Sequence, residues 1–320
     1  MTLWRMAWRN VWRNRRRSAI TIFAITIGLA ALTFLWGFTD GMNQEMIRNT
    51  TRYLAGDVQV HLEGYHDDPT LDRGMANASP VMTVVRRDPA VAAASERLEG
   101  RALASRGDKS RGVTLLGVAP AEEARVSDLF KAVIDGAALG DTPERDALVG
   151  ATLAEALGLK ADDELVLIGQ AYDGSLASGR FTVRGVFRTK IDELDGFLVV
   201  MHLQAVREFL ASPEGTTAVA LRLKSQSEVA AAVERLATQL GKQYEVLGWP
   251  RLLPMVVASV RYHEVMGFVL LAIFFAVVAA GVANPVLMAV LERTREFGVM
   301  LALGTSQARL LRLVVYEAVL

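Results

Sequence analysis

The stretch that decides the fold is residues 18 to 39, which read SAITIFAITIGLAALTFLWGFT, 22 residues without one charged side chain. As a helix, a stretch of this length extends about 33 Å, enough to cross a bilayer core of about 30 Å. A cleaved signal peptide is the alternative, but its apolar region is usually about 7 to 15 residues long and ends at a small-residue cleavage site. This run is longer and ends in Gly37-Phe38-Thr39-Asp40, which is a poor cleavage site. We therefore expect a membrane-anchored helix over residues 18–39.

A second uncharged run covers residues 265–291. As a helix it extends about 40 Å. A buried helix of a soluble protein is the alternative, although such a helix rarely continues this far without a charge. Because proline removes a backbone hydrogen bond, Asn284-Pro285 predicts a kink or local unwinding near the end of the run. We interpret residues 265–291 as a second membrane span.

The charges indicate how these spans are oriented. Residues 1–17 carry six arginines and no acid, whereas residues 40–264 carry 25 basic and 32 acidic side chains, although the net charge of the chain is zero. By the positive-inside rule, residues 1–17 form a cytoplasmic, Arg-rich N-terminus, and residues 40–264 lie outside the cytoplasm. The arginines then contact anionic lipid rather than nucleic acid. Residues 292–306 return to the cytoplasm, and residues 307–320 are expected to begin a third span in a truncated chain.

The segment between the spans predicts an α+β domain. Residues 40–54 continue the first helix as a stalk, and alternation at 58–62 predicts a strand. A helix at 90–98 and a strand at 101–105 complete one β-α-β unit. Residues 217–248 repeat that order, which suggests a split β-α-β sheet with helices on one face. Residues from about 119 to 216 are strand-rich and are interpreted as an inserted subdomain.

Motifs for catalysis or cofactor binding are not found in the sequence. Gly241-Lys242-Gln243 lacks the phosphate-cradling pattern, and the chain has no Cys. The acidic cluster at 67–72 lacks the spacing of a calcium loop and is interpreted as a solvated turn. We expect no enzyme activity, no metal site and no catalytic or cofactor-binding residue. The four histidines lack the spacing that places two on one helix face: His61, His66, His202 and His263.

The informative stretch follows the second run and reads ERTREFGVMLALG at residues 292–304. On a helix, its charged residues are neighbours at three or four positions and its apolar residues act as anchors. Such a helix suits docking into a groove on a partner protein. An ordinary charged loop at the end of a membrane helix is the alternative. The predicted docking residues are Glu292, Arg293, Arg295, Glu296, Phe297, Gly298, Met300, Leu301, Ala302 and Gly304.

These residues also carry a family resemblance. The Glu-Arg-x-Arg-Glu-Phe-Gly run at 292–298, the Ala-Leu-Gly at 302–304, Trp8-Arg9-Asn10, Arg15-Arg16-Arg17 and the segment 55–61 (AGDVQVH) resemble the FtsX-like permeases of type VII ABC systems. That superfamily includes MacB-type exporters and lipoprotein-releasing proteins of the LolC/LolE type. The resemblance implies four membrane spans, a MacB-like periplasmic core domain between the first two spans, permease dimers and a coupling helix that contacts a cytoplasmic ATPase.

The resemblance also implies the function. The chain is expected to be a permease subunit of the bacterial inner membrane that couples ATP hydrolysis to movement of its periplasmic domain, releasing or exporting lipoprotein or another amphiphile by mechanotransmission. ATP and Mg would be bound by the partner ATPase and no cofactor by this chain. The other expected partners are a second permease, identical or different, membrane lipid, and a periplasmic carrier or adaptor. A membrane-anchored sensor and a noncatalytic regulator of an extracytoplasmic enzyme remain alternatives.

Overall fold

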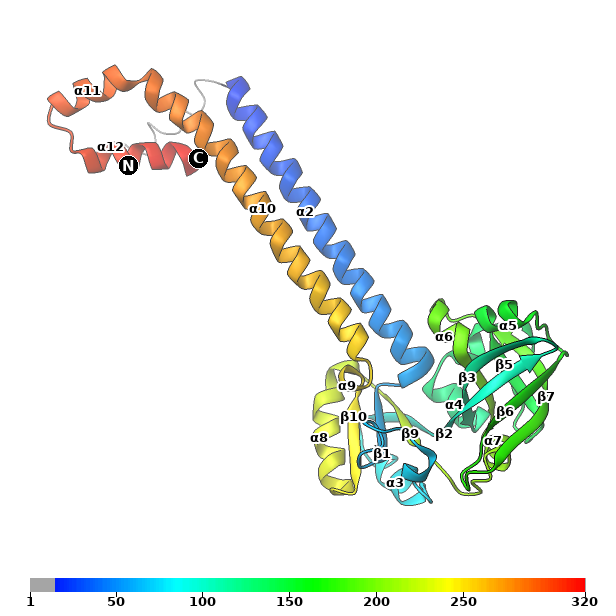
Figure 1. The fold of residues 1–320 in the computed structure, drawn as a ribbon. Coiled ribbons are helices and arrows are strands. Elements are labelled where there is room, and N and C mark those ends of the chain that lie inside the picture. Colours follow the sequence, from blue (N-terminus) through cyan, green and yellow to red (C-terminus); the bar gives the residue numbers. More distant parts are fainter. Residues whose placement is uncertain (1–14, 320) are drawn as a thin grey trace. The chain divides into compact units, whose positions relative to one another are not determined.

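The computed structural model describes residues 15–319 and divides into two compact units. One unit is helical and contains the described parts of 1–44 and 258–320; the other is an α+β unit, Glu45–Val257. Its bounds fall inside the predicted segment 40–264. Two long helices, α2 (Arg15–Thr50) and α10 (Pro254–Glu292), form most of the helical unit (Figure 1). Most of the predicted Arg-rich N-terminus, residues 1–14, lies outside the described residues.

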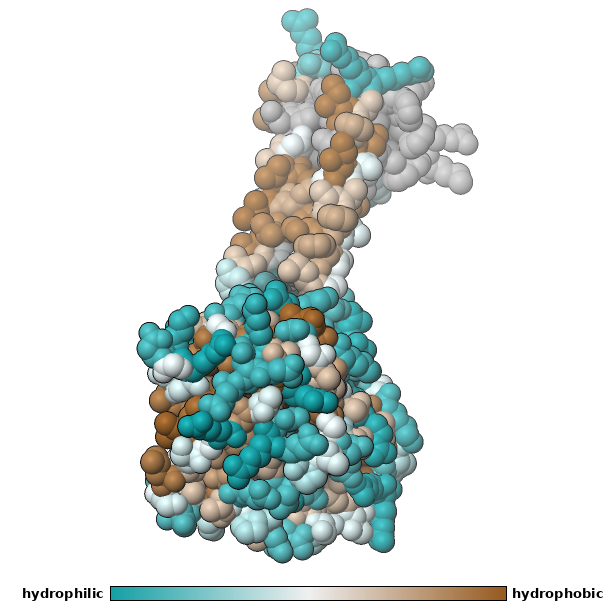
Figure 2. All heavy atoms as spheres, turned by 90° about the vertical axis from the view of Figure 1, so that its right-hand side faces the viewer, coloured by the Kyte–Doolittle hydropathy of each residue, from teal (hydrophilic) through white to brown (hydrophobic). Residues whose placement is uncertain are grey.

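The helical unit exposes its apolar surface. Among the described residues, two segments are long and apolar enough to cross a membrane, Ile25–Ala55 and Pro254–Gly281, and no residue of either apolar window is buried. The space-filling view shows these helices as an apolar column (Figure 2). Such exposure does not fit the core helix of a soluble protein, and it fits contact with lipid. The backbone of α10 stays helical through residues 284 and 285, which excludes local unwinding there and leaves the kink at Pro285 as a prediction.

Aromatic side chains and glycines join α2 to α10. The rings of Trp36 and Phe268 meet edge to face, with their centroids 5.7 Å apart. A Cβ atom added at Gly28 would lie 2.3 Å from the ring of Phe274. Glycine at such a position lets two helices approach closely, as small residues do in membrane helix pairs.

The first part of the α+β unit is a four-stranded antiparallel sheet in the order β10-β1-β9-β2. Helices α3 and α8 pack on one face of it, over a core that includes Val58, Val60 and Leu221. This arrangement confirms the predicted split β-α-β sheet. Its elements are β1 (Val58–Leu62), α3 (Ser79–Val85), β2 (Val91–Arg106), β9 (Ala218–Leu223), α8 (Val229–Leu240) and β10 (Tyr244–Gly248).

The predicted helix at 90–98 is wrong, because these residues begin strand β2. Residues 91–97 pair with β9, and from Arg97 onward β2 also pairs with β3 (Lys109–Val118). Ala, Glu, Arg and Leu favour a helix in isolation, but pairing with β9 along this segment, and with β3 from Arg97 onward, overrides that preference. The helix of the first β-α-β unit is instead α3, which lies between β1 and β2.

The second part of the unit shares β2 with the first and continues from it into β3. From β3 the pairing continues through β8, β5 and β7 to β6, and β6 pairs back onto β2, so these six strands close on themselves. Apolar side chains such as Leu115, Val149 and Leu167 fill a common core. The remaining elements are η2 (Thr51–Ala55), η3 (Leu71–Arg73), α4 (Pro120–Val126), η4 (Leu129–Ala132), β4 (Val133–Gly136), β5 (Asp146–Gly150), α5 (Ala151–Leu157), β6 (Glu164–Gln170), β7 (Leu176–Phe187), α6 (Asp192–Phe197), β8 (Leu198–His202), α7 (Leu203–Phe209), η5 (Gln226–Glu228) and α9 (Trp249–Leu252).

Candidate functional site

The predicted docking segment forms a short helix between two breaks. Helix α10 ends at Glu292, Arg293 leaves helical geometry with φ −108° and ψ 14°, and α11 then covers Thr294–Ala302. Gly304 has a φ of +90°, which favours glycine, and α12 (Gln307–Val319) follows. The helix is therefore shorter than the predicted range 292–306.

One face of α11 is occupied within the chain. Arg293 Nε donates to Glu296 Oε2 at 2.8 Å, and the Arg293 guanidinium lies 5.8 Å from the centroid of the Phe297 ring. Phe297 and Met300 are half-buried. One predicted anchor, Phe297, thus already contacts Arg293, and a second, Met300, is half-buried.

The other face of the segment is open and mixes charge with apolar surface. Sequence reasoning named Leu301, which is 42% exposed, but missed Val299 and Leu303, which are 59% and 82% exposed. The apolar character of Val299 and Leu303 was the signal in the sequence that could have identified them. Of the predicted docking residues, Arg293, Phe297 and Met300 are half-buried, and the exposed ones are Glu292, Arg295, Glu296, Gly298, Leu301, Ala302 and Gly304.

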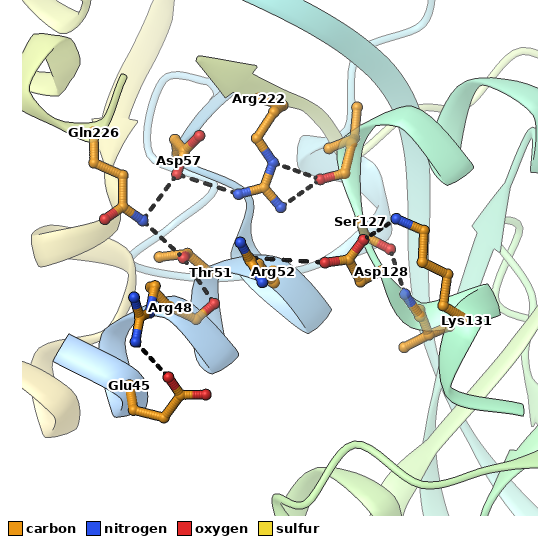
Figure 3. A network of polar contacts seen from close by, with 12 residues as sticks. Glu45, Arg48, Thr51, Arg52, Asp57, Ser127, Asp128, Lys131, Arg222 and Gln226 are labelled. Carbon is orange, nitrogen blue, oxygen red and sulfur yellow. Dashed lines mark hydrogen bonds and ion pairs between the residues drawn. The ribbon is translucent and has the colours of Figure 1, made fainter. Parts of the chain in front are cut away.

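A polar network holds the C-terminal end of α2 and η2 in the α+β unit (Figure 3). Gln226 Nε2 donates to Thr51 Oγ1 at 3.2 Å and to Asp57 Oδ1 at 3.4 Å. The buried Asp57 carboxylate also accepts from the Leu223 amide at 2.9 Å and pairs with Arg222 at 3.5 Å. These contacts tie η2 and the start of β1 to β9 and η5.

The same network reaches the second part of the unit. Arg222 donates two hydrogen bonds to the Val126 carbonyl oxygen, at 2.9 and 2.7 Å, at the end of α4. The Asp128 amide donates to the Arg52 carbonyl oxygen at 2.9 Å, and the two side chains form an ion pair at 3.8 Å. The end of α2 is therefore fastened to both parts of the α+β unit, in what we call the polar joint: Thr51, Arg52, Asp57, Asp128, Arg222 and Gln226.

A buried ion pair lies next to this joint. Arg97 Nη2 donates to Glu123 Oε1 at 2.6 Å, Arg97 Nε donates to Glu123 Oε2 at 3.2 Å, and Arg97 also donates to the Leu54 carbonyl oxygen. The two side chains are 0% and 2% exposed. Burial raises the pKa of Glu123, but the Arg97 charge and its hydrogen bonds outweigh burial and hold the pKa below its usual value. The charged pair thus fixes β2 to α4 and to η2.

The segment 55–61, which carried part of the resemblance, is built into this region. Gly56 has a φ of +71°, and a Cβ atom there would lie 2.9 Å from the Leu221 carbonyl oxygen. Gln59 Nε2 donates to the Ala55 carbonyl oxygen at 2.8 Å. Sequence reasoning did not identify the polar joint, because Arg222 and Gln226 lie far away in the sequence and carry no motif.

The described residues hold no group of three or more His, Cys, Asp or Glu that could bind a metal ion. In the acidic cluster at 67–72, Asp68 pairs with Arg73 at 3.1 Å. This pairing fits a solvated turn.

Family comparisons identify the kind of protein. Residues 18–239 match the MacB-like periplasmic core domain, and residues 268–320 match the FtsX-like permease C-terminal region. The chain belongs to the FtsX-like permeases with a MacB-like periplasmic core domain. This permease is therefore a membrane-embedded ABC transporter subunit with a periplasmic domain between two transmembrane helices. Permeases of this family work with an ATPase subunit that supplies the ATPase activity.

Individual relatives are distant. The permease is 25% identical over 301 residues to the lipoprotein-releasing system transmembrane protein LolC of Xylella fastidiosa, covering 92% of this chain and 70% of LolC. It is 26% identical over 326 residues to the pyoverdine export ATP-binding/permease protein PvdT of Pseudomonas fluorescens, covering 96% of this chain and 47% of PvdT. The periplasmic region of MacB from Actinobacillus actinomycetemcomitans matches at 12% identity and a TM-score of 0.45, covering 66% of this chain and 97% of that one.

Proposed function

We propose that this permease couples ATP hydrolysis by a separate cytoplasmic ATPase to movement of its periplasmic domain, and that this movement releases or exports a lipoprotein or another amphiphile. The observation that carries the proposal is the continuity of α2. It is one helix of 36 residues, and it leads through η2 into the polar joint. Because a helix is stiff along its axis, a displacement at the membrane end would be delivered to Thr51 and Asp57.

The input of this movement would be the segment 292–304. It joins α10 to α11 and exposes charged and apolar side chains together, which suits a groove on a soluble partner. Glu292, Arg295 and Glu296 would set the orientation of docking. Val299, Leu301 and Leu303 would supply its apolar contacts.

The substrate class is inferred from relatives whose names differ. LolC is named for lipoprotein release and PvdT for pyoverdine export, so the two names do not specify one substrate. A lipoprotein is favoured because LolC matches over the larger share of its own length. The other proposed partners are a second permease subunit, membrane lipid and a periplasmic carrier or adaptor.

A break in α2 tests the coupling directly. Gln44 is an exposed residue of α2, so Gln44→Pro changes the helix backbone rather than core packing. Proline inside a helix removes one hydrogen bond and kinks the helix, at a cost of about 3 kcal/mol. We expect Gln44→Pro to leave ATPase binding in place and to abolish lipoprotein release from vesicles, whereas Gln44→Ala should keep both. Wild-type release by Gln44→Pro would overturn the proposal in favour of a sensor or regulator.

We also propose that the protein lies in the bacterial inner membrane with its N-terminus and residues 292–306 in the cytoplasm. The chain has no Cys, so single cysteines can be introduced without removing others. In intact cells, a thiol reagent that cannot cross the inner membrane should label Asp108→Cys and should not label Thr305→Cys. The reverse pattern would overturn this orientation.

A further inference from the structure

A cavity of about 350 Å³ opens in the α+β unit beside the end of α2. Its apolar lining comes from separate parts of the chain: Leu54 and Ala55 in η2, Leu116 in β3, Leu198 in β8 and Leu252 at the end of α9. Pockets that hold small ligands begin at about 300 Å³ and combine an apolar lining with a few polar groups. The size and walls of this cavity suit the apolar body of a small amphiphile.

His61 supplies a hydrogen-bond acceptor in the wall. Its side chain is on the sheet face opposite Val58 and Val60, which pack under the helices, and it is 4% exposed. Nδ1 lies 2.9 Å from the Thr217 carbonyl oxygen. Because a carbonyl oxygen only accepts, Nδ1 carries the proton and Nε2 is the acceptor. Nε2 is buried and has no hydrogen-bond partner among the described residues.

The ring of His61 is held in this orientation. Tyr65 stacks on it with the ring centroids 5.1 Å apart and the planes 12° from parallel. Burial lowers the pKa of His61 to about 4, so the imidazole is neutral near pH 7. An acceptor that is fixed, neutral and unpartnered calls for a ligand that donates a hydrogen bond.

Glu99 adds a second acceptor to the same cavity. Its amide donates to Thr217 Oγ1 at 2.8 Å, so Thr217 holds both His61 and Glu99. The Glu99 side chain is half-buried, and burial raises its pKa against the opposing effect of Arg97. The Arg97 guanidinium is itself committed to Glu123 and to the Leu54 carbonyl oxygen. Among the described residues, the Glu99 carboxyl group therefore forms no ion pair, and Arg97 acts on its pKa without pairing with it.

We propose that this cavity binds the ammonium end of an amphiphile. The N–H groups of a primary alkylammonium ion donate to His61 Nε2 and to the Glu99 carboxylate, and its alkyl chain lies against the leucine wall. A cation satisfies both acceptors at once, which neither a neutral alcohol nor an anion does. This inference rests on the proposed function, because it assigns a binding position to an amphiphile of the kind that the permease would release or export. Binding is measured without ATPase or release, so the two proposals can fail separately.

The test uses the full chain in lipid nanodiscs with ¹⁵N-labelled histidine. The chain has four histidines, and His61→Gln assigns the Nε2 resonance of His61. The probes share one alkyl chain: octylammonium, octanol, octanoate and octyltrimethylammonium. Octylammonium keeps its proton near neutral pH. It should shift the Nε2 resonance saturably, with an affinity about tenfold or more above that of each other probe, since charge-assisted hydrogen bonds are the stronger ones.

Two substitutions distinguish the contribution of the Glu99 carboxylate to binding from the contribution of the cavity itself. Glu99→Gln should weaken octylammonium binding about tenfold or more. Glu164→Gln is the matched control, because Glu164 is exposed on β6 and lies outside the cavity, and it should bind as the wild type does. Equal shifts from octanol and octylammonium, no shift from any probe, or unchanged binding by Glu99→Gln would each overturn the proposal. Should Glu99→Gln not fold, the four probes on the wild-type protein decide.

Discussion

Two Arg–Glu pairs in this molecule have nearly the same length and different surroundings. Arg97 and Glu123 are 2.6 Å apart with side chains 0% and 2% exposed, whereas Arg293 and Glu296 are 2.8 Å apart with side chains 16% and 55% exposed. A buried pair is costly to break, because the remaining charge stays out of water, whereas an exposed pair contributes about 0 to 1 kcal/mol. The first pair therefore fixes the domain, whereas the second contributes little to folding and occupies one face of α11, beside the face that stays exposed.

The largest expected effect breaks the buried pair. Glu123→Ala should lower the free energy of unfolding by about 3 to 5 kcal/mol, because it leaves the Arg97 charge buried without its partner. Glu122→Ala is the neighbouring control. Glu122 pairs with the exposed Arg86, so its loss should cost about 1 kcal/mol or less. Chemical unfolding of the purified permease gives both values, and equal losses would refute the contrast between buried and exposed pairs.

Lowering the pH should destabilise the α+β unit by protonating the buried His61. Its pKa is about 4 in the folded chain, against 6.5 for an ordinary histidine. Between these values the unfolded chain binds more protons, so stability should fall as the pH is lowered from 6.5 to 4, by on the order of 3 kcal/mol. Glu99, whose pKa is raised, changes stability in the opposite direction. The contribution of His61 is therefore measured as the difference in the free energy of unfolding between the wild type and His61→Gln from pH 6.5 to pH 4. A difference that stays constant over this pH range would contradict the prediction.

The exposed region should matter for binding rather than for folding. Leu303→Ala removes an exposed side chain, so it should weaken ATPase binding by about 2 kcal/mol without changing permease stability. Phe297→Ala should weaken binding to a similar extent and also destabilise α11, since Phe297 is half-buried against Arg293. Arg295→Ala should cost about 1 kcal/mol or less. Co-purification and permease-stimulated ATP hydrolysis measure binding. Wild-type values for Leu303→Ala and Phe297→Ala together would remove the docking assignment.

The smallest expected effect lies in the membrane helices. Gly28→Ala forces the Phe274 ring to move and should destabilise the pairing of α2 with α10 by about 1 kcal/mol. Gly37→Ala lies on the same helix with no atom of the described residues within 4 Å of the added Cβ, so it should show only the helix-propensity gain of about 0.5 to 1 kcal/mol that both substitutions share. Thermal unfolding in nanodiscs compares the two variants. Equal melting temperatures would show that the helices do not pack at Gly28.

Sequence reasoning succeeded where local pattern and physical environment agree. The two uncharged runs identified α2 and α10, because lipid excludes charges from a whole segment. Gly158, which ends helix α5 with a φ of +72°, shows the same agreement, because glycine favours that backbone conformation. Sequence reasoning failed at β2, whose residues 90–98 favour a helix locally and become a strand through pairing with β9 and β3.

The sequence by itself determined the two long apolar helices and the second β-α-β unit, since each depends on residues that are neighbours along the chain, whereas the docking segment stays a prediction. Only the tertiary structure decided that β6 closes onto β2, that Arg222 and Gln226 meet Asp57, and that His61 and Glu99 are both held by Thr217. These contacts join residues more than one hundred positions apart, apart from those of β2 with β6. Hydropathy and spacing describe only local order, whereas such contacts depend on how the strands pair.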